Sequence, residues 1–199
     1  RSLGRDAVML QADISVKSEV EAMVDRIIDH FGRIDILVNN AGIARGGSLL
    51  DMSEKDWDVV LDTDLKGVFL CTQAVAKHMV KNSTGKIINI ASYAALGAIP
   101  NTVNYSAAKA GVVAFTKIAA FELGKYGIYV NSISPGMTKT DMSGQNTPEE
   151  TKLKLDLSIL KRFASPQEIA NVAVFLASDE SSMITAQNIR VDGGSYRHL

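Results

Sequence analysis

The chain has 199 residues, of which 46% are hydrophobic and 22% charged, and its net charge is −1. This composition is typical of a globular protein with one sizeable core, so we expect a single domain over residues 1–199. The small net charge argues against nucleic acid or an anionic membrane as a partner, and no apolar run is long enough to cross a bilayer. The one cysteine, Cys71, excludes a disulfide framework and favours the cytoplasm, and three scattered histidines predict no metal site.

Short β-rich runs alternate with longer helical patterns along the chain. The first run, residues 7–12, predicts a buried strand. Residues 18–31 then carry apolar side chains at helical spacing and predict a helix. Ser18 with Glu21 fits a capping box at the start of this helix, and Ser15, one turn earlier, is the rival cap.

The middle of the chain continues the alternation. Residues 34–38 are mostly apolar, which suits a strand covered on both faces. After a glycine-rich loop, Ser53 with Asp56 opens a long helical region over about 54–81, with a bend expected near Gly67.

The remaining elements repeat the pattern. We predict strands at 86–90, 128–133 and 189–191 and helices at 104–126 and 167–177, the last with Pro166 at its start. Residues 141–163 are polar with some helical character and no strand signal. Such alternation with short connections predicts an α/β fold with a doubly wound, Rossmann-like parallel sheet, in which ligands bind beyond the carboxyl ends of the strands.

Candidate catalytic residues follow the predicted strands. Tyr105 and Lys109 are four positions apart, so on a helix their side chains share a face. Alone, this pair also fits the surface of an amphipathic helix. Ser92, however, follows a predicted strand, and the other positions of 105–111 are small, which suits close packing against a helix or a ligand. The sequence Asn-Asn-Ala-Gly at 39–42 ends a different strand.

Together these motifs resemble the short-chain dehydrogenase/reductase family. The resemblance covers nearly the whole chain, because the family's segments occur in order and at matching spacing at 13–14, 39–42, 92, 105–109, 135–136 and 192–194. It implies an NAD(P)-dependent enzyme that moves a hydride between nicotinamide and a carbon bearing oxygen.

The resemblance also implies the roles of the central residues. Tyr105 would be the general acid/base, and because a free tyrosine has a pKa of about 10, Lys109 would favour its phenolate by charge. Ser92 would hydrogen-bond the substrate oxygen, and Lys109 would also reach the ribose hydroxyls of the cofactor. The positive nicotinamide ring of the oxidised cofactor would add to the effect of Lys109.

Further residues are implied as cofactor contacts. Asp13 would accept from the adenine amino group beside the Ile14 backbone, although a turn or capping carboxylate is the alternative role for Asp13. Thr138 and Thr140 would hold the carboxamide end, or else are simple loop hydroxyls. The positions implied to let the cofactor approach the backbone are Asn40, Ala41, Gly42, Pro135 and Gly136.

Asp64 departs from the family pattern, which has asparagine there in a water-linked proton relay to the active-site lysine. An aspartate has nearly the same shape but carries a charge, so it is expected to draw off part of the influence of Lys109 on Tyr105. We therefore expect a working but altered relay. Replacing Asp64 with asparagine should raise turnover or shift its pH optimum.

The family's opening strand–helix–strand–helix unit, with its glycine-rich pyrophosphate turn, has no counterpart in this sequence. We expect the chain to be a fragment of a longer protein, or else a degenerate product without turnover. The strands at 7–12 and 34–38 should then have unpaired edges, so that the chain as given binds cofactor weakly and aggregates.

The overall run of motifs most resembles bacterial 3-oxoacyl-(acyl-carrier-protein) reductases, with sugar, polyol or other secondary-alcohol dehydrogenases as the alternative. This resemblance favours NADP over NAD, an acyl-thioester or other small substrate and a homotetramer. Acyl carrier protein is a candidate partner for a basic face, unless the lysines are simply solvated; these lysines are Lys77, Lys81, Lys86 and Lys125. A catalytically silent binding or scaffold protein on the same fold is the alternative of another class.

Overall fold

The computed structural model describes residues 4–140 and 147–195. Its longer helices are α1 (Lys17–Phe31), α2 (Glu54–Leu61), α3 (Gly67–Asn82), α4 (Val103–Gly124), α5 (Pro148–Asp156) and α6 (Pro166–Ala177). Three short helical segments are the π-helix η1 (Asp62–Lys66) and the 3-10 helices η2 (Tyr93–Ala95) and η3 (Asp179–Ser181). The strands are β1 (Ile36–Asn39), β2 (Gly85–Ile90), β3 (Ile128–Pro135) and β4 (Asn188–Val191).

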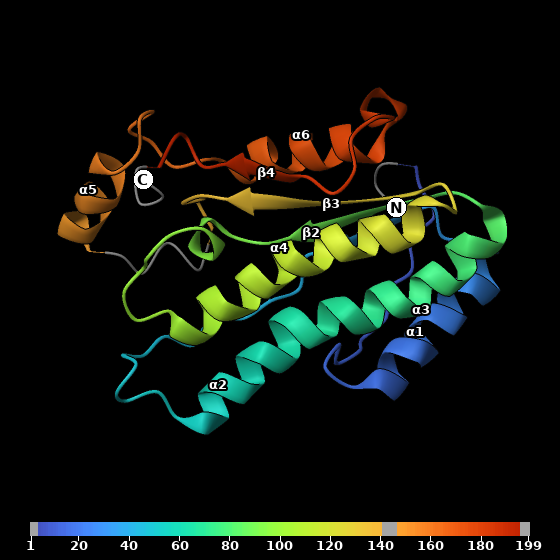
Figure 1. Ribbon diagram of the computed structural model, residues 1–199, viewed down its shortest axis with the longest axis horizontal. Coiled ribbons are helices and arrows are strands. Elements are labelled where there is room, and N and C mark those ends of the chain that lie inside the picture. Colours follow the sequence, from blue (N-terminus) through green and yellow to red (C-terminus); the bar gives the residue numbers. More distant parts are fainter. Residues whose placement is uncertain (1–3, 141–146, 196–199) are drawn as a thin grey trace.

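The four strands form one sheet in the order β1-β2-β3-β4, and every neighbouring pair is parallel (Figure 1). The register sets Val38 beside Ile88 and Ile133 beside Ile189. Parallel strands need crossover connections, and here helices supply them. The predicted α/β fold with a parallel, Rossmann-like sheet is confirmed.

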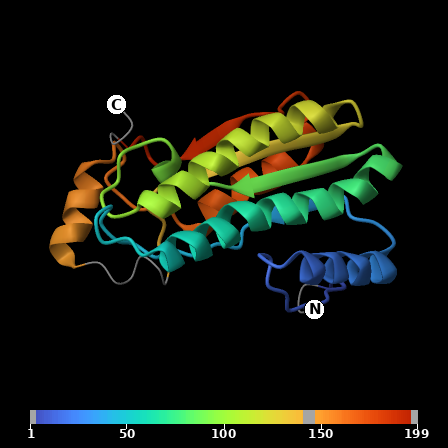
Figure 2. The same cartoon turned by 60° about the horizontal axis from the view of Figure 1, so that its bottom comes forward.

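Helices cover both faces of the sheet (Figure 2). On one face, Ile87 and Val130 pack with side chains from α1, α3 and α4 in the largest cluster of buried residues. On the other face, Ile88 and Ile133 pack against Leu176 of α6. Because successive side chains of a strand point to opposite faces, the run of isoleucines in β2 serves both layers.

The strand predicted at 7–12 is wrong. This segment is coil, in which Val8 is 45% and Met9 96% exposed. Asp6, the residue before the segment, lies 2.9 Å from His30 of α1. A strand is defined by hydrogen bonds to a neighbouring strand, and none of the four strands in the described residues lies beside it. An apolar sequence pattern does not show whether a neighbouring strand is present.

The helix predicted at 18–31 is confirmed as α1, but both predicted caps are wrong. Its N-cap is Val16, which makes no side-chain capping bond. The Ser15 hydroxyl instead donates to Asp13 Oδ1 at 2.7 Å, and Glu19 accepts the Asp13 N–H at 2.8 Å. The polar groups near the helix start are therefore used by the turn at Asp13.

The long helical region at 54–81 is present, and its predicted cap is confirmed, since Ser53 accepts the Asp56 N–H at 3.0 Å. The interruption lies just before Gly67, in the π-helix η1. Gly67 itself has ordinary helical angles and permits close packing, because a Cβ there would lie 2.7 Å from Ile14 Cδ1. The extra residue of the π-turn, rather than the glycine, breaks the helix.

The other predicted elements are found with ends shifted by one or two residues. Within 141–163, the described part contains α5, and residues 141–146 lie outside the described residues. Strand β1 is an edge of the sheet, with Ile36 47% and Val38 45% exposed, so the open edge predicted for this strand is observed. None of the helices in the described residues is long and apolar enough to span a membrane.

Candidate functional site

Three connections converge at the carboxyl end of the sheet, on the left in Figure 1. Ser92 follows β2, Tyr105 lies in the first turns of α4, and the loop beginning at Asn40 follows β1. The loop after β3 comes to the same edge, because the Tyr93 hydroxyl lies 3.1 Å from Met137 Sδ. Ligands of parallel α/β sheets bind at this edge.

Asn104 fixes the start of α4. Its side chain is fully buried, and its amide donates to the backbone oxygens of Arg45 at 3.0 Å and Asp56 at 2.9 Å. Its Oδ1 accepts the Tyr105 N–H at 2.8 Å. This one side chain therefore joins the loop after β1, α2 and α4, and it sets where Tyr105 stands. Asn104 was not among the predicted site residues, although a polar residue at the start of an otherwise apolar helix was the available signal.

Ser92 is buried in extended backbone at the start of η2. Its Oγ accepts the Ala94 N–H at 3.1 Å, and its hydroxyl lies close enough to Tyr105 to lower the pKa of the phenol. The structure thus brings the predicted serine and tyrosine together, as the resemblance implied.

Lys109 is 4% exposed and has its ammonium held on two sides. Its Nζ donates to the Ile90 backbone oxygen at 3.1 Å and lies 3.2 Å from Asp64 Oδ2 as an ion pair. The same ammonium is 5.6 Å from the centroid of the Tyr105 ring. The shared helix face of Tyr105 and Lys109 is confirmed, and Asp64 contacts Lys109 directly.

Asp64 is fully buried in η1. Its Oδ1 accepts the Ile43 N–H at 2.8 Å. Its Oδ2 faces Lys109 but makes no hydrogen bond of regular geometry, although the charges are close enough to pair. Burial raises the pKa of the Asp64 carboxyl, while Lys109 and the Ile43 N–H oppose that rise. We take the pair as charged, because an ammonium at this distance favours the carboxylate.

The Tyr105 phenol is held in its protonated form. Burial raises the pKa of Tyr105, the Ser92 hydroxyl lowers it, and the charges of Asp64 and Tyr93 raise it further. Lys109 was expected to favour the phenolate by charge. In the structure, burial is the main cause that keeps the phenol protonated, and the charge of Asp64 acts in the same direction.

Two glycines make room around this pair. A Cβ on Gly42 would lie 3.0 Å from Asp64 Oδ2 and 3.2 Å from Lys109 Nζ, so the backbone at Gly42 stands directly over the pair. A Cβ on Gly111 would lie 2.8 Å from Leu65 Cδ2, so α4 and η1 touch where small residues were predicted to allow close packing. Asn40, Ala41 and Gly42 are exposed, as a backbone that contacts a ligand must be.

A buried amide network lies beneath the site. The Asn39 side chain donates to Asn89 Oδ1 at 2.8 Å and to Thr72 Oγ1 at 3.0 Å. Asn89 in turn donates to Thr116 Oγ1 at 2.9 Å. These bonds join β1, β2, α3 and α4 side by side. Asn39 was noted only as part of a motif, and no sequence signal pointed to Asn89 or Thr116.

Asp13, the predicted adenine contact, has a structural role in the turn before α1. Asp13 is exposed, and its Oδ1 accepts from both the N–H and the hydroxyl of Ser15, with the hydroxyl bond as the main cause of its lowered pKa. Ile14 packs against Gly67, one residue after η1. The turn role weighed for Asp13 is therefore observed.

The segment after β3 packs against the last strand. Gly136 donates to the Val191 oxygen at 2.9 Å, and a Cβ on Gly136 would lie 2.6 Å from Asp192 Cα, so only glycine fits there. Thr138 Oγ1 donates to the Gly136 oxygen at 3.1 Å. Pro135 ends β3, and Thr140 is exposed. Of these residues, the geometry ties Gly136 most tightly to the fold.

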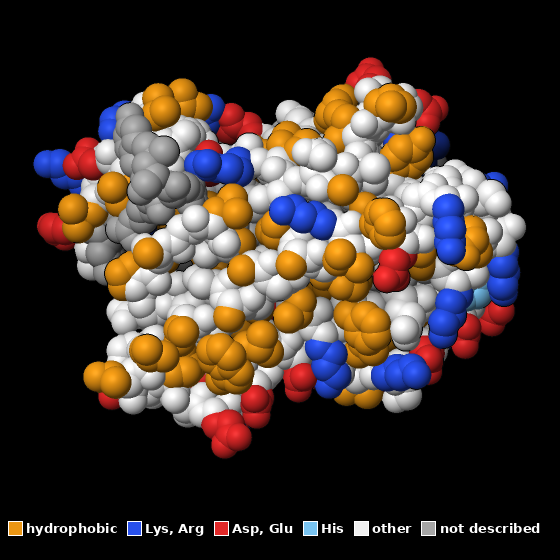
Figure 3. Space-filling model, viewed as in Figure 1, with side chains coloured by type: hydrophobic (Ala, Val, Ile, Leu, Met, Phe, Trp, Pro, Cys, Tyr) orange, Lys and Arg blue, Asp and Glu red, His pale blue; other side chains and the backbone are white. Residues whose placement is uncertain are grey.

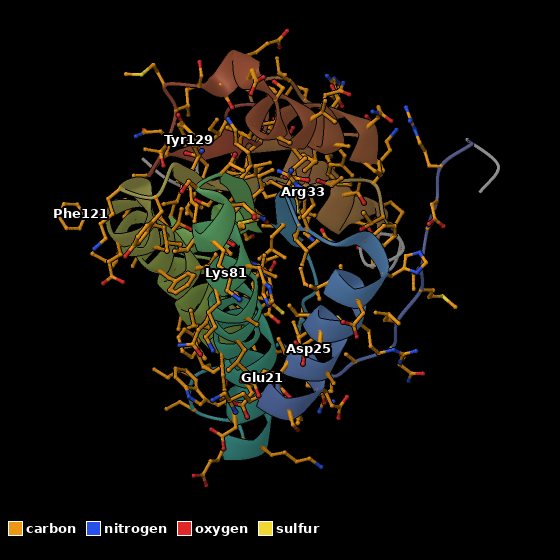
Figure 4. All side chains as sticks on the ribbon, turned by 90° about the vertical axis from the view of Figure 1, so that its right-hand side faces the viewer. Glu21, Asp25, Arg33, Lys81, Phe121 and Tyr129 are labelled. Carbon is orange, nitrogen blue, oxygen red and sulfur yellow. The ribbon has the colours of Figure 1, made fainter. Side chains whose placement is uncertain are left out.

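Figure 4 views the opposite end of the sheet, where the amino ends of the strands lie. Lys81 and Tyr129 stand at this end. Lys86 is occupied there, since its Nζ donates to the Ser178 oxygen at 3.1 Å and lies 4.3 Å from the centre of the Tyr129 ring. The predicted lysine face is therefore remote from Tyr105. Among the described residues, no group of three or more His, Cys, Asp or Glu side chains could hold a metal.

Comparisons with known proteins identify similar sequences and a similar structure. The sequence model of a family described as "Enoyl-(Acyl carrier protein) reductase" matches residues 1–196. The chain is 49% identical over 183 residues, 92% of this chain and 73% of the relative, to (2S)-((R)-hydroxy(phenyl)methyl)succinyl-CoA dehydrogenase subunit BbsD of Thauera aromatica. It is 45% identical over 192 residues, 96% of this chain and 76% of the relative, to a 3-oxoacyl-(acyl-carrier-protein) reductase of Synechocystis sp..

A solved structure is similar throughout. The chain superimposes on NAD+-bound xylitol dehydrogenase with a TM-score of 0.93 and 30% sequence identity. The match covers 98% of this chain and 81% of that chain.

Proposed function

Because the chain belongs to the short-chain dehydrogenase/reductase family and is an NAD(P)-dependent oxidoreductase, we propose that Tyr105, Ser92 and Lys109 carry its reaction. One observation supports this most directly. The Tyr105 phenol lies beside the Ser92 hydroxyl, which lowers its pKa, and one helical turn from a buried ammonium. A carbonyl oxygen between Ser92 and Tyr105 would meet two hydroxyl donors.

Each residue has a distinct part in the proposed chemistry. The nicotinamide supplies or accepts the hydride at the substrate carbon. Tyr105 gives its phenolic proton to the carbonyl oxygen in reduction and takes it back in oxidation. Ser92 donates a hydrogen bond to the same oxygen and orients it. Lys109 favours the phenolate form of Tyr105 and faces the backbone at Gly42.

The residues present fit a nicotinamide nucleotide at this edge. Gly42 leaves an exposed backbone over Lys109, and a side chain there would fill the space beside the ammonium. We propose that Asn40, Ala41 and Gly42 line the nucleotide, with Pro135, Gly136, Thr138 and Thr140 at its carboxamide end. Asp13 Oδ1 already accepts two hydrogen bonds from Ser15. We propose that Asp13 contacts the adenine through its other carboxylate oxygen, and that the Ile14 backbone lies beside the adenine.

Replacing Tyr105 with phenylalanine tests the proposal. The change removes the hydroxyl and leaves the ring, so kcat for carbonyl reduction should fall by about 10²–10⁴-fold, the usual contribution of a positioned acid. Nicotinamide absorbance measures the rate, and thermal unfolding should show a nearly unchanged midpoint.

Tyr126→Phe is the matched control, because this tyrosine lies beyond the far end of α4 and its ring sits 5.1 Å from Lys125 Nζ. It should keep the rate of the parent protein. A Tyr105→Phe protein as fast as this control would refute the assignment.

We propose an acyl thioester as the substrate. The two relatives above act, by their names, on a succinyl-CoA and on a 3-oxoacyl group carried by acyl carrier protein, and they are more similar in sequence than the polyol enzyme. Exposed apolar side chains beside the last strand suit an acyl chain, since Ile159 and Leu160 are each 58% exposed and contact Gly193 or Gly194.

A polyol or another secondary alcohol is the second candidate, favoured by the likeness to xylitol dehydrogenase. A panel of 3-oxoacyl-CoA, 3-oxoacyl-carrier-protein, xylitol and simple secondary alcohols separates the two. The thioesters should show kcat/KM values at least about tenfold higher, a difference of about 1.4 kcal/mol in transition-state binding. Equal or better use of xylitol would favour the second candidate.

An acyl carrier protein that donates the thioester would not dock on the lysine face. That face begins near Lys86 at the amino end of β2, and a strand of six residues spans about 20 Å before Ser92 is reached. A carrier would have to dock at the carboxyl end of the sheet to present its thioester to Tyr105. Charge reversal of Lys77 or Lys81 should therefore leave KM for carrier-bound substrate unchanged.

We also propose NADP as the preferred cofactor, a cytoplasmic location and a homotetramer, each by analogy with the carrier-protein reductases. The ratio of kcat/KM for NADPH and NADH tests the cofactor. The tetramer would pair α3 and α4 between subunits, and Figure 3 shows hydrophobic side chains spread over the face that these helices form. Phe121 of α4 projects away from the body of the protein in Figure 4.

A further inference from the structure

We propose that Asp64 is a positioning residue that holds the Lys109 ammonium away from Tyr105 and so biases the site toward carbonyl reduction near neutral pH. This inference rests on the proposed function, in which Tyr105 exchanges the proton. It concerns the rates in the two directions and leaves the equilibrium of the reaction unchanged.

The geometry divides the ammonium of Lys109 between two acceptors. The Ile90 oxygen at 3.1 Å and Asp64 Oδ2 at 3.2 Å lie close to Nζ, whereas the centre of the Tyr105 ring is 5.6 Å away. Asp64 is fully buried, so water does not screen its charge. The π-turn η1 holds this carboxylate in place, because Oδ1 is bound to the Ile43 N–H.

Burial is the main cause that raises the pKa of Tyr105, and the Ser92 hydroxyl opposes it. Among nearby charges, Asp64 and Tyr93 raise this pKa further. The neighbouring charges on η1 pair with each other at the surface, where Lys66 Nζ lies 3.1 Å from Asp62. Asp64 is thus the one carboxylate in the described residues that acts on Tyr105 and Lys109 together.

The consequence follows from the proton balance. In reduction, a hydride forms the new C–H bond and the phenol gives its proton to the carbonyl oxygen, leaving phenolate. In oxidation, the phenolate takes the proton back. A carboxylate that disfavours the phenolate keeps the form needed for reduction populated to higher pH and reduces the form needed for oxidation.

Asp64→Asn tests the inference, with Asp62→Asn as the matched control on the same turn. Each change removes one negative charge, but Asp62 is exposed and paired with Lys66. In Asp64→Asn, the rising limb of kcat for alcohol oxidation should move to lower pH by about one unit, the smaller end of the effect of a near charge. Asp62→Asn should leave the limb where it is in the parent protein.

A second readout needs no turnover. The tyrosinate absorbance of the protein without nucleotide is titrated, and the curve of a Tyr105→Phe protein is subtracted to remove the other four of the five tyrosines. The pH midpoint of the Tyr105 titration should be lower in Asp64→Asn than in the parent protein, and it should be unchanged in Asp62→Asn. If Asp64→Asn does not fold, Asp64→Ser replaces it, because the smaller side chain leaves room for water beside Lys109.

The outcomes separate the two proposals. An unchanged or higher Tyr105 midpoint in the Asp64 variant overturns the role of Asp64, whatever the substrate is. If no thioester or alcohol is turned over while the midpoint still falls, the proposed function fails and the electrostatic role of Asp64 stands.

Discussion

At the scale of single residues, buried asparagines hold together the elements that carry the proposed catalytic side chains. Ser92, Tyr105 and Lys109 occupy positions that a spacing pattern reveals. The side-chain amides of Asn104 and Asn89 donate hydrogen bonds to partners between 27 and 59 positions away, which no local pattern contains. Their roles appear only when the elements are packed together.

Asn89 offers a test of this buried network. Asn89→Ala leaves the Asn39 amide without its closest acceptor and removes a donor to Thr116. Because unsatisfied buried polar groups are costly, the free energy of unfolding should fall by about 2–3 kcal/mol. Urea denaturation measures it. Asn171→Ala on the surface of α6, whose side chain bonds only to exposed Gln167, should cost less than about 0.5 kcal/mol; equal losses would contradict the prediction.

At the scale of elements, success depended on whether a signal was local. The cap of α2 at Ser53 was found because a capping bond joins residues three apart. The strand at 7–12 was wrong because a strand needs a neighbour, and the π-turn at η1 was missed because one extra residue in a helix leaves no mark in an apolar pattern. The parallel sheet was predictable because the alternation of elements is itself a long-range pattern.

The start of α6 gives a pH-dependent prediction. Ser165 and Glu168 form a reciprocal capping box, and Arg162 binds the same carboxylate, with Nη1 2.8 Å from Oε2. The bond from Arg162 is the main cause that lowers the pKa of Glu168 to about 2. Because the pKa is lowered in the folded protein, the ionised carboxylate stabilises the fold at pH values above its unfolded pKa near 4.5. This contribution is lost as the pH falls toward 2.

Glu168→Gln should therefore lower the thermal midpoint at pH 7, and the gap to the parent protein should narrow as the pH falls from about 4.5 to 2. Glu149→Gln, in the exposed first turn of α5, serves as the control and should show a gap that is small at every pH. If the difference in thermal midpoint between Glu168→Gln and the parent protein stays constant through this pH range, the carboxylate charge does not stabilise the helix.

At the scale of the whole molecule, the fold leaves several large apolar side chains exposed. The outer strand β1 leaves side chains of Ile36 and Val38 half-exposed, and α4 carries Phe121 at 86% and Ile118 at 61% exposure. A sequence can show that such residues are apolar, but not that the fold leaves them on the outside. The proposed tetramer would cover the helical face.

Phe121→Glu tests that assembly. A charge placed in an apolar interface between subunits should shift the protein to smaller species in sedimentation, with the fold retained. Val174→Glu on α6, at the other face of the sheet, replaces a side chain that is 68% exposed and should leave the assembly intact. Identical sedimentation of both variants and the parent would exclude α4 from the interface.

The contact between Gly136 and Asp192 has a consequence for synthesis on the ribosome. The loop that follows β3 is braced by β4, through the Gly136 N–H and the Val191 oxygen. A nascent polypeptide halted before Asn188 would hold Ser92, Tyr105 and Lys109 yet lack this brace. Enzymatic competence should therefore appear only after β4 has left the exit tunnel of the ribosome.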